Sequence, residues 1–148
     1  LGAFEDDLDP ISEEARTILK TLPGIIHIDW SDHVEYFMHI AHLLIHASYR
    51  EGFPNTLLQA GAMGCPIICT EIEGSVDIVT HKETGLIFQP GNAEELLEKL
   101  RYALANKDEM TGYSKALQRK VEEKFSQQYL HEFIRQKYLE LLQQRASS

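Results

Sequence analysis

The alternation of short apolar runs with helical segments is the feature that most constrains this fold. Residues 25–28 (IIHI), 43–47 (LLIHA), 66–70 (PIICT) and 86–88 (LIF) are rich in β-branched residues, and segments with helical periodicity separate them. Apolar strands that alternate with helices are typical of a parallel sheet with both faces covered. We therefore predict an α/β fold: a Rossmann-like parallel sheet with helices on both faces.

Helix signals support the same organisation. We expect a first helix that begins after Ser12, a helix capped by Asn92, and two closing helices, the last of which begins at Ser126. Three further helices are predicted at residues 34–41, 56–64 and 75–79.

Length and charge limit the function classes. The chain has 148 residues, enough for one domain of ordinary size, and 23 acidic against 14 basic side chains give it a formal charge of −9. This balance repels nucleic acid, so no nucleic-acid partner is expected. The chain shows no signal-peptide pattern and no initiating Met, so we expect it to be a cytoplasmic piece of something longer.

Neither the cysteines nor the histidines predict a metal or redox site. Cys65 and Cys69 flank a four-residue strand span of ~13 Å, beyond the ~7 Å limit for a disulfide, so both are expected to be packing thiols in a reducing compartment. His39, His42 and His46 have metal-like spacing only on one continuous helix, and the strand expected at 43–47 interrupts it. No metal site is predicted.

The segment SYREGFPN (48–55) joins a predicted strand to a predicted helix. In parallel sheets, ligands bind at the carboxyl ends of the strands, where helix N-termini attract anions. Gly52 lets a ligand approach the backbone, Pro54 has no N–H to leave unpaired, and Asn55 can cap the helix. Together these residues predict a phosphate cradle made of backbone groups.

Two polar residues flank this cradle. Glu51 lies in the loop, and Gln59 lies on the first or second turn of the predicted helix. Both suit the hydroxyls of a ribose or a sugar. On spacing alone an alternative stays open, in which Glu51 is a solvated loop charge and Gln59 a surface residue.

Longer stretches of the chain resemble a known family. EGFPNTLLQAGAMGCPIICT, EGSVDIV, ETGLIF and PGNAEEL occur in the order seen in the C-terminal half of retaining GT-B glycosyltransferases of the group 1 type, and FSQQYLHEF resembles their closing helix. The resemblance runs from about residue 25 to residue 125. It is nearest to bacterial enzymes that build capsular and surface polysaccharides.

The resemblance implies roles for the residues of the cradle. Glu51 stands where the family has the Glu that meets the donor sugar, and it is our candidate catalytic residue. Gly52 and Phe53 stand at the turn that meets the diphosphate, with Pro54 and Asn55 beside them. Gln59 stands where the family usually has a second Glu that holds the ribose.

Other positions carry weaker implications. Trp30 and Ser31 resemble the family's base-contacting loop, although Trp30 is equally explained as a hydrophobic lid. Gly74, Ser75 and Asp77 fall at a Gly-rich turn and are interpreted as mainly structural. Arg50 is expected to form a surface ion pair.

The resemblance also implies a reaction and partners. The donor would be a UDP- or GDP-sugar, transferred with retention to a saccharide or lipid-linked acceptor, with no cofactor. Residues 1–148 would be the nucleotide-sugar-binding C-terminal domain, without its first βα unit and the N-terminal domain that could bring the enzyme to the inner face of the membrane. The apolar positions of the last helix predict that the isolated chain forms homodimers.

Two alternatives are kept. One is a nucleotide-sugar epimerase of the same architecture, although the EGFPN motif argues against it. The other is a non-catalytic nucleotide-binding module, which Gln at position 59 favours.

Overall fold

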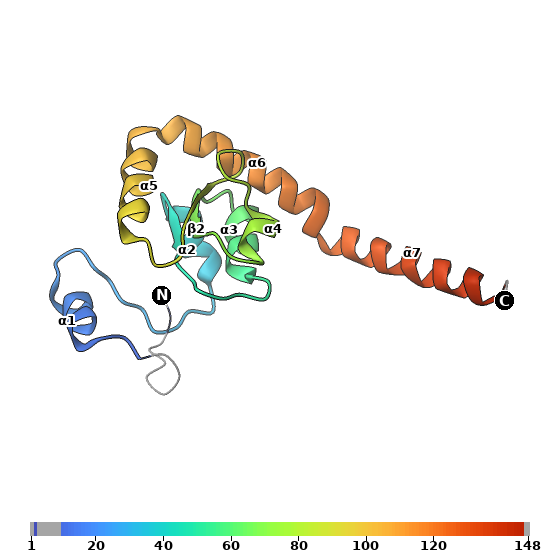
Figure 1. Cartoon of the computed structure of the whole chain (residues 1–148), viewed down its shortest axis with the longest axis horizontal. Helices are drawn as coiled ribbons and strands as arrows, with labels where there is room; N and C mark the ends of the chain where they lie inside the picture. The colour runs from blue at the N-terminus through green and yellow to red at the C-terminus, as the bar shows by residue number, and fades with distance from the viewer. Residues whose placement is uncertain (1, 3–9, 147–148) are drawn as a thin grey trace. The chain divides into compact units, whose positions relative to one another are not determined.

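A computed structural model describes Gly2 and residues 10–146 of the chain. The chain divides into two compact units, Leu1–Val34 and Glu35–Ser148, and each is described separately. Figure 1 shows the elements of both units.

The first unit contains one helix and an extended segment. Helix α1 (Glu13–Thr21) begins at Ser12, as predicted, because the Ser12 side chain accepts a hydrogen bond from the Ala15 N–H. The chain then turns at Gly24, which has a φ of +90°.

The prediction of a strand at residues 25–28 is wrong. The Ile25 N–H donates to the Leu22 carbonyl, and the Ile28 carbonyl accepts from the Gly2 N–H, so these backbone groups serve a turn and a single contact. Ile26 is 82% exposed, whereas a strand inside a parallel sheet is buried on both faces. The composition of a strand is present here, but the described residues supply no neighbouring strand for it.

The second unit carries the sheet. Its elements in chain order are α2 (Val34–Ile40, which starts at the unit boundary), β1 (Leu44–His46), α3 (Asn55–Ala62), β2 (Ile67–Thr70), α4 (Ser75–Ile78), β3 (Leu86–Phe88), α5 (Ala93–Ala105), α6 (Lys107–Phe125) and α7 (Gln127–Ala146). The three remaining strands and the helices predicted at 34–41, 56–64 and 75–79 are therefore confirmed to within two residues at each end, and the helix after Asn92 and the two closing helices are present.

The sheet is parallel, with strand order β1-β2-β3 among the described residues. Its register pairs His46 with Cys69 across β1 and β2, and Thr70 with Phe88 across β2 and β3. The three carboxyl ends therefore lie at one edge of the sheet, which we call the carboxyl edge. The predicted α/β class is confirmed.

Alternate residues of the strands face two separate cores. Ile67 and Cys69 of β2 pack against α3, α4 and α6, while Ile68 packs against α5 and the start of α6. Figure 1 shows α5 on one side of the sheet and α3 and α4 on the other. Helices thus cover both faces, which explains why the strands read as continuous apolar runs.

Side-chain caps fix two other helix starts. The side-chain oxygen Oδ1 of Asn92 accepts a hydrogen bond from the Glu95 N–H at 3.0 Å, which confirms the predicted start of α5. The Ser126 hydroxyl accepts from the Tyr129 N–H, which confirms the start of α7.

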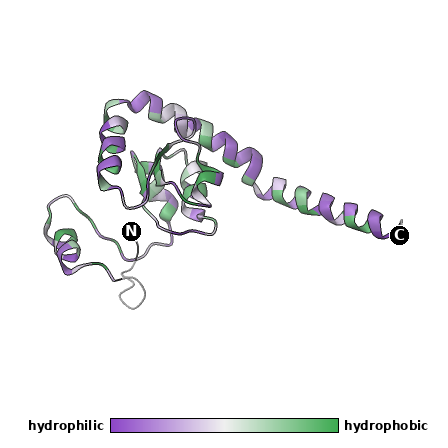
Figure 2. Cartoon of the chain, viewed as in Figure 1, coloured by the Kyte–Doolittle hydropathy of each residue, from purple (hydrophilic) through white to green (hydrophobic). Residues whose placement is uncertain are grey.

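Helix α7 is exposed along its described length. Its large apolar side chains are exposed: Tyr129, Leu130, Phe133, Ile134, Tyr138, Leu139, Leu141 and Leu142. Figure 2 shows hydrophobic stretches that alternate with hydrophilic ones along α7. In the part of the chain that the structure describes, no helix combines the length and the apolar character that crossing a bilayer requires.

A carboxylate ties α5 to α6 at their corner. Glu109 of α6 accepts hydrogen bonds from the hydroxyls of Tyr102 on α5 and Tyr113 on α6. These bonds, first that of Tyr102 and then that of Tyr113, lower the pKa of Glu109 from its ordinary value.

This cluster predicts a pH-dependent contribution to stability. A carboxyl whose pKa is lowered by folding stabilises the native state at pH values above its ordinary pKa, and the contribution is lost as the pH falls through the lowered pKa. We expect Glu109→Gln to melt at a lower temperature than the unmodified chain at pH 7, and the gap to close below about pH 4. Thermal melts at several pH values test this, with Glu98→Gln on the exposed face of α5 as the control. A gap that does not change with pH would contradict it.

Candidate functional site at the carboxyl edge

The segment that leaves β1 is fixed to the end of β2 by a buried hydroxyl. The Thr70 side chain donates a hydrogen bond to the Ser48 carbonyl at 2.6 Å and accepts one from the Ser48 N–H at 3.2 Å. Thr70 is 2% exposed, so both bonds are shielded from competing water. The loop that carries Glu51 therefore starts from a defined point.

The next turn is fixed by a close approach of two backbones. Gly74, at the start of α4, has a φ of +80°, and a Cβ built on it would lie 2.7 Å from the Gly52 carbonyl oxygen and 3.0 Å from Pro54 Cδ. Only glycine fits both the conformation and the space. A Cβ on Gly52 itself would meet nothing within 4 Å, so the space beside that residue is open.

Helix α3 starts at this turn, one residue earlier than predicted. Pro54 occupies the N-cap position, and no side chain caps the helix. The prediction that Asn55 caps α3 is therefore wrong: Asn55 is already the first helical residue. The start of α3 is left without a side-chain acceptor for its N–H groups, which is the arrangement that favours an anionic ligand.

Lys120 of α6 holds the opposite end of the short helix α4. Its ammonium donates to the carbonyls of Asp77 and Ile78, at 3.1 and 2.7 Å. Burial, followed by the neighbouring Lys124, lowers the pKa of Lys120. Asp77 thus contributes a backbone carbonyl here, which agrees with its structural interpretation.

Glu51 lies next to a histidine. Glu51 Oε1 is 3.4 Å from His46 Nε2 at the end of β1, and the two side chains are 32% and 14% exposed. His46 pairs in register with Cys69, a free and buried cysteine. Burial raises the pKa of Cys69 to about 12, so this thiol is neutral near pH 7 and is no nucleophile.

Phe53 and Gln59 face the C-terminal part of α6. The Phe53 ring packs on the ring of Phe125 at the end of α6, with centroids 5.7 Å apart, so this side chain anchors the turn to α6. Gln59 is exposed on α3 and lines a hollow together with residues of α6, among them Gln118 and Glu122. The structure thus brings Glu51, Gly52, Phe53, Pro54 and Asn55 together on one turn, with Gln59 one helical turn further on.

Trp30 and Ser31 belong to the first unit and are described within it alone. Trp30 is 78% exposed, and its indole N–H donates to Asp32 at 3.3 Å. The Ser31 hydroxyl accepts from the His33 N–H. The exposed ring covers no core within that unit.

Polar side chains also close the ends of β2 and β3. The Gln89 side-chain amide donates to Glu71, and the Gln89 N–H donates to the Glu95 carboxylate at 2.9 Å. Among the described residues, no three His, Cys, Asp or Glu side chains are grouped as a metal site would need.

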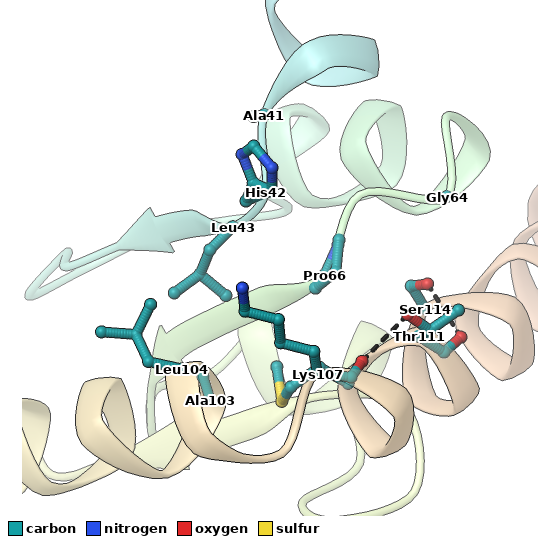
Figure 3. Close-up of a pocket in the computed structure, with 11 residues that line it drawn as sticks. Ala41, His42, Leu43, Gly64, Pro66, Ala103, Leu104, Lys107, Thr111 and Ser114 are labelled. Carbon is teal, nitrogen blue, oxygen red and sulfur yellow. Dashed lines mark hydrogen bonds between the residues drawn. The ribbon is translucent and has the colours of Figure 1, made fainter.

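A separate hollow of about 330 Å³ lies at the opposite edge of the sheet (Figure 3). Its walls include Leu43, Pro66, Ala103 and Met110, and the Lys107 side chain reaches across it toward Leu43. The hydroxyls of Thr111 and Ser114 donate to carbonyls of their own helix, at 2.9 and 3.0 Å. Their hydrogens are therefore used within α6, and this hollow contains no predicted site residue.

Comparison with known proteins identifies the family. Residues 18–124 match the family model described as glycosyl transferases group 1. The chain belongs to this family. This group 1 chain is 27% identical over 139 residues to the capsular polysaccharide biosynthesis glycosyltransferase CapM of Staphylococcus aureus, a match that covers 93% of this chain and 36% of CapM.

A second relative comes from Campylobacter jejuni. It is N,N'-diacetylbacillosaminyl-diphospho-undecaprenol alpha-1,3-N-acetylgalactosaminyltransferase, 33% identical over 94 residues, which cover 64% of this chain and 24% of that protein. The group 1 chain therefore spans about a third or less of the length of these two relatives.

Solved structures agree with the fold. Anabaena HepE in complex with UDP-glucose matches with a TM-score of 0.74 at 19% identity, over 89% of this chain and 36% of HepE. A glycosyltransferase from Rickettsia africae matches with a TM-score of 0.73 at 28% identity, over 80% of this chain and 32% of its own. The structural neighbours are GT-B glycosyltransferases, so the chain has the α/β fold found in part of those enzymes.

Sequence reasoning missed two residues of this edge. Thr70 was included in a strand, although a polar residue at the end of a buried apolar run is itself a signal. His46 was considered only as a metal ligand, although side-chain alternation puts it on the same face as Leu44, which packs on the α3 side of the sheet.

The close approach of Gly52 and Gly74 gives a testable prediction. Gly74→Ala should destabilise the chain by about 2 kcal/mol or more, because the Cβ meets backbone and the φ is unfavourable. Gly112→Ala is the matched control: it lies inside α6 with open space around it, and should stabilise by up to ~1 kcal/mol. Urea unfolding measures both. Equal stability of Gly74→Ala and the unmodified chain would show that the two backbones do not meet this closely.

Proposed function

We propose that this chain is the nucleotide-sugar-binding, C-terminal domain of a retaining GT-B glycosyltransferase. The observation that carries the proposal is the uncapped start of α3 beside the open backbone of Gly52, at the carboxyl edge of the sheet in a group 1 chain. This is the position at which open parallel sheets bind ligands. Backbone N–H groups there can hold a diphosphate although the chain carries a net charge of −9.

The proposed chemistry uses the same groups. When the bond between the sugar and the diphosphate breaks, the diphosphate gains negative charge and the sugar becomes oxocarbenium-like. A fixed helix N-terminus that faces the growing charge stabilises this transition state. Glu51 contacts the donor sugar, Gly52, Phe53, Pro54 and Asn55 form the diphosphate turn, and Gln59 meets the ribose.

Relatives support the substrate class. Crystal structures of HepE contain UDP or UDP-glucose. We propose a UDP- or GDP-sugar as the donor. The Campylobacter relative is named for an undecaprenol-linked substrate, and CapM for capsular polysaccharide, which supports a saccharide or lipid-linked acceptor handled at the inner face of the membrane.

The exposed edge of the sheet is evidence for further segments in the complete protein. Among the described strands β1 is at an edge, and its Ile45 is 43% exposed, whereas parallel sheets usually bury such residues. We propose that a first βα unit and an N-terminal domain complete the protein. The apolar side chains of α7 would pack in that complete protein, and in the isolated chain they would favour a homodimer.

A thermal-shift screen tests the proposed function. A nucleotide diphosphate or its sugar at a hundred times its Kd adds ~2.7 kcal/mol of stability, which for a chain of this size raises Tm by about 5–10 °C. We expect one base to give this shift, and EDTA to leave it unchanged, because backbone N–H groups meet the phosphates. If no UDP- or GDP-compound raises Tm, the proposal is wrong; a shift that EDTA removes would contradict its metal-free chemistry.

The proposed role of Gln59 can be measured separately. A carboxylate makes stronger hydrogen bonds to ribose hydroxyls than an amide, and the ribose separates this position from the phosphates. Gln59→Glu should tighten nucleotide binding roughly three- to tenfold, and Gln59→Ala should weaken it by a similar factor, as ~1 kcal/mol implies. Calorimetry on the three proteins measures this. Unchanged Kd values in both variants would make Gln59 a surface residue only.

A further inference from the structure

We propose that His46 is a positioning residue for Glu51, which it holds in the orientation that meets the donor sugar. The inference rests on the proposed function, because it assigns a support to the residue proposed to contact that sugar. Neither the family match nor the named relatives assign a role to this histidine.

The location of His46 restricts what its imidazole can reach. The residue ends β1, and alternation along the strand turns its side chain to the face of Leu44, which packs on the core beside α3. Its in-register neighbour on that face is the buried Cys69, whose neutral thiol provides no charge. The side chain is only 14% exposed, so it is largely shielded from solvent on the α3 side of the sheet.

The imidazole ring of His46 makes its polar contact with Glu51. Nε2 lies 3.4 Å from Glu51 Oε1, whereas Nδ1 is buried and has no hydrogen-bond partner in the described part of the chain. A buried nitrogen without a partner costs free energy that an aliphatic side chain would avoid. The histidine therefore fits this position poorly as a packing residue, and its contact with Glu51 supplies the missing reason for it.

Glu51 needs such a support because the loop fixes its backbone and not its carboxylate. Thr70 holds Ser48 before it, and the close approach to Gly74 holds Gly52 after it. Among the described residues, the Glu51 side chain has one ion-pair or hydrogen-bond partner, which is His46. Without the imidazole, this carboxylate would sample several rotamers and would lose entropy each time it bound a sugar.

The test compares a nucleotide with its sugar conjugate, because Glu51 is proposed to meet only the sugar. Calorimetry on the full chain would measure Kd for UDP and for UDP-glucose, or for the best-binding pair from the thermal-shift screen. We expect His46→Leu to weaken binding of the nucleotide sugar three- to tenfold and that of the nucleotide less than twofold. His46→Gln, whose amide can donate to Glu51, should recover part of the loss.

A double variant separates support from packing. If His46 acts through Glu51, His46→Leu combined with Glu51→Gln should bind the nucleotide sugar no worse than Glu51→Gln alone. Additive losses, or equal weakening of nucleotide and nucleotide sugar by His46→Leu, would overturn the inference while leaving the proposed function in place. Absence of binding by the unmodified chain to every UDP- and GDP-compound would refute the proposed function itself, and this inference with it.

Discussion

The site depends first on the two hydrogen bonds between the Thr70 hydroxyl and the backbone of Ser48. They join the end of β2 to the segment that leaves β1, at a point closed to water. Glu51, the diphosphate turn and Gln59, which are proposed to meet the sugar, the phosphates and the ribose, all follow Ser48 within a dozen residues. Because β1 is only three residues long, its own ladder could not fix the loop, and the buried hydroxyl supplies the missing restraint.

The binding surface proposed at this turn consists largely of backbone. The turn at Gly52 rests on Gly74 and has open space beside it, and α3 begins there without a side-chain cap. Backbone N–H groups bring partial positive charge without a basic residue. This reconciles an acidic chain with the proposed anionic ligand, and it explains why charge counting along the sequence says little about such a site.

The sequence predicted the elements whose formation depends on local residue patterns. It did not predict the features that depend on contact with a distant part of the chain. Strands β1, β2 and β3 were predicted because buried parallel strands need apolar residues at every position. Residues 25–28 have the same composition, but no neighbouring strand is described for them, and composition cannot reveal that. Asn55 was predicted as a cap because the residue type suits one, whereas Pro54 already occupies that position. The meeting of Gly52 with Gly74 and of His46 with Glu51 depends on tertiary geometry, which residue spacing does not contain.

The approach of Gly52 to Gly74 has a consequence for how binding would proceed. Two backbones within van der Waals range leave that turn little room to close over a ligand or to open for one. A ligand bound at this turn would therefore find it in nearly the same shape before and after binding, as in lock-and-key recognition. Adaptation to different sugars would have to come from side chains and from other segments. The turn itself would accept only groups that fit its existing shape.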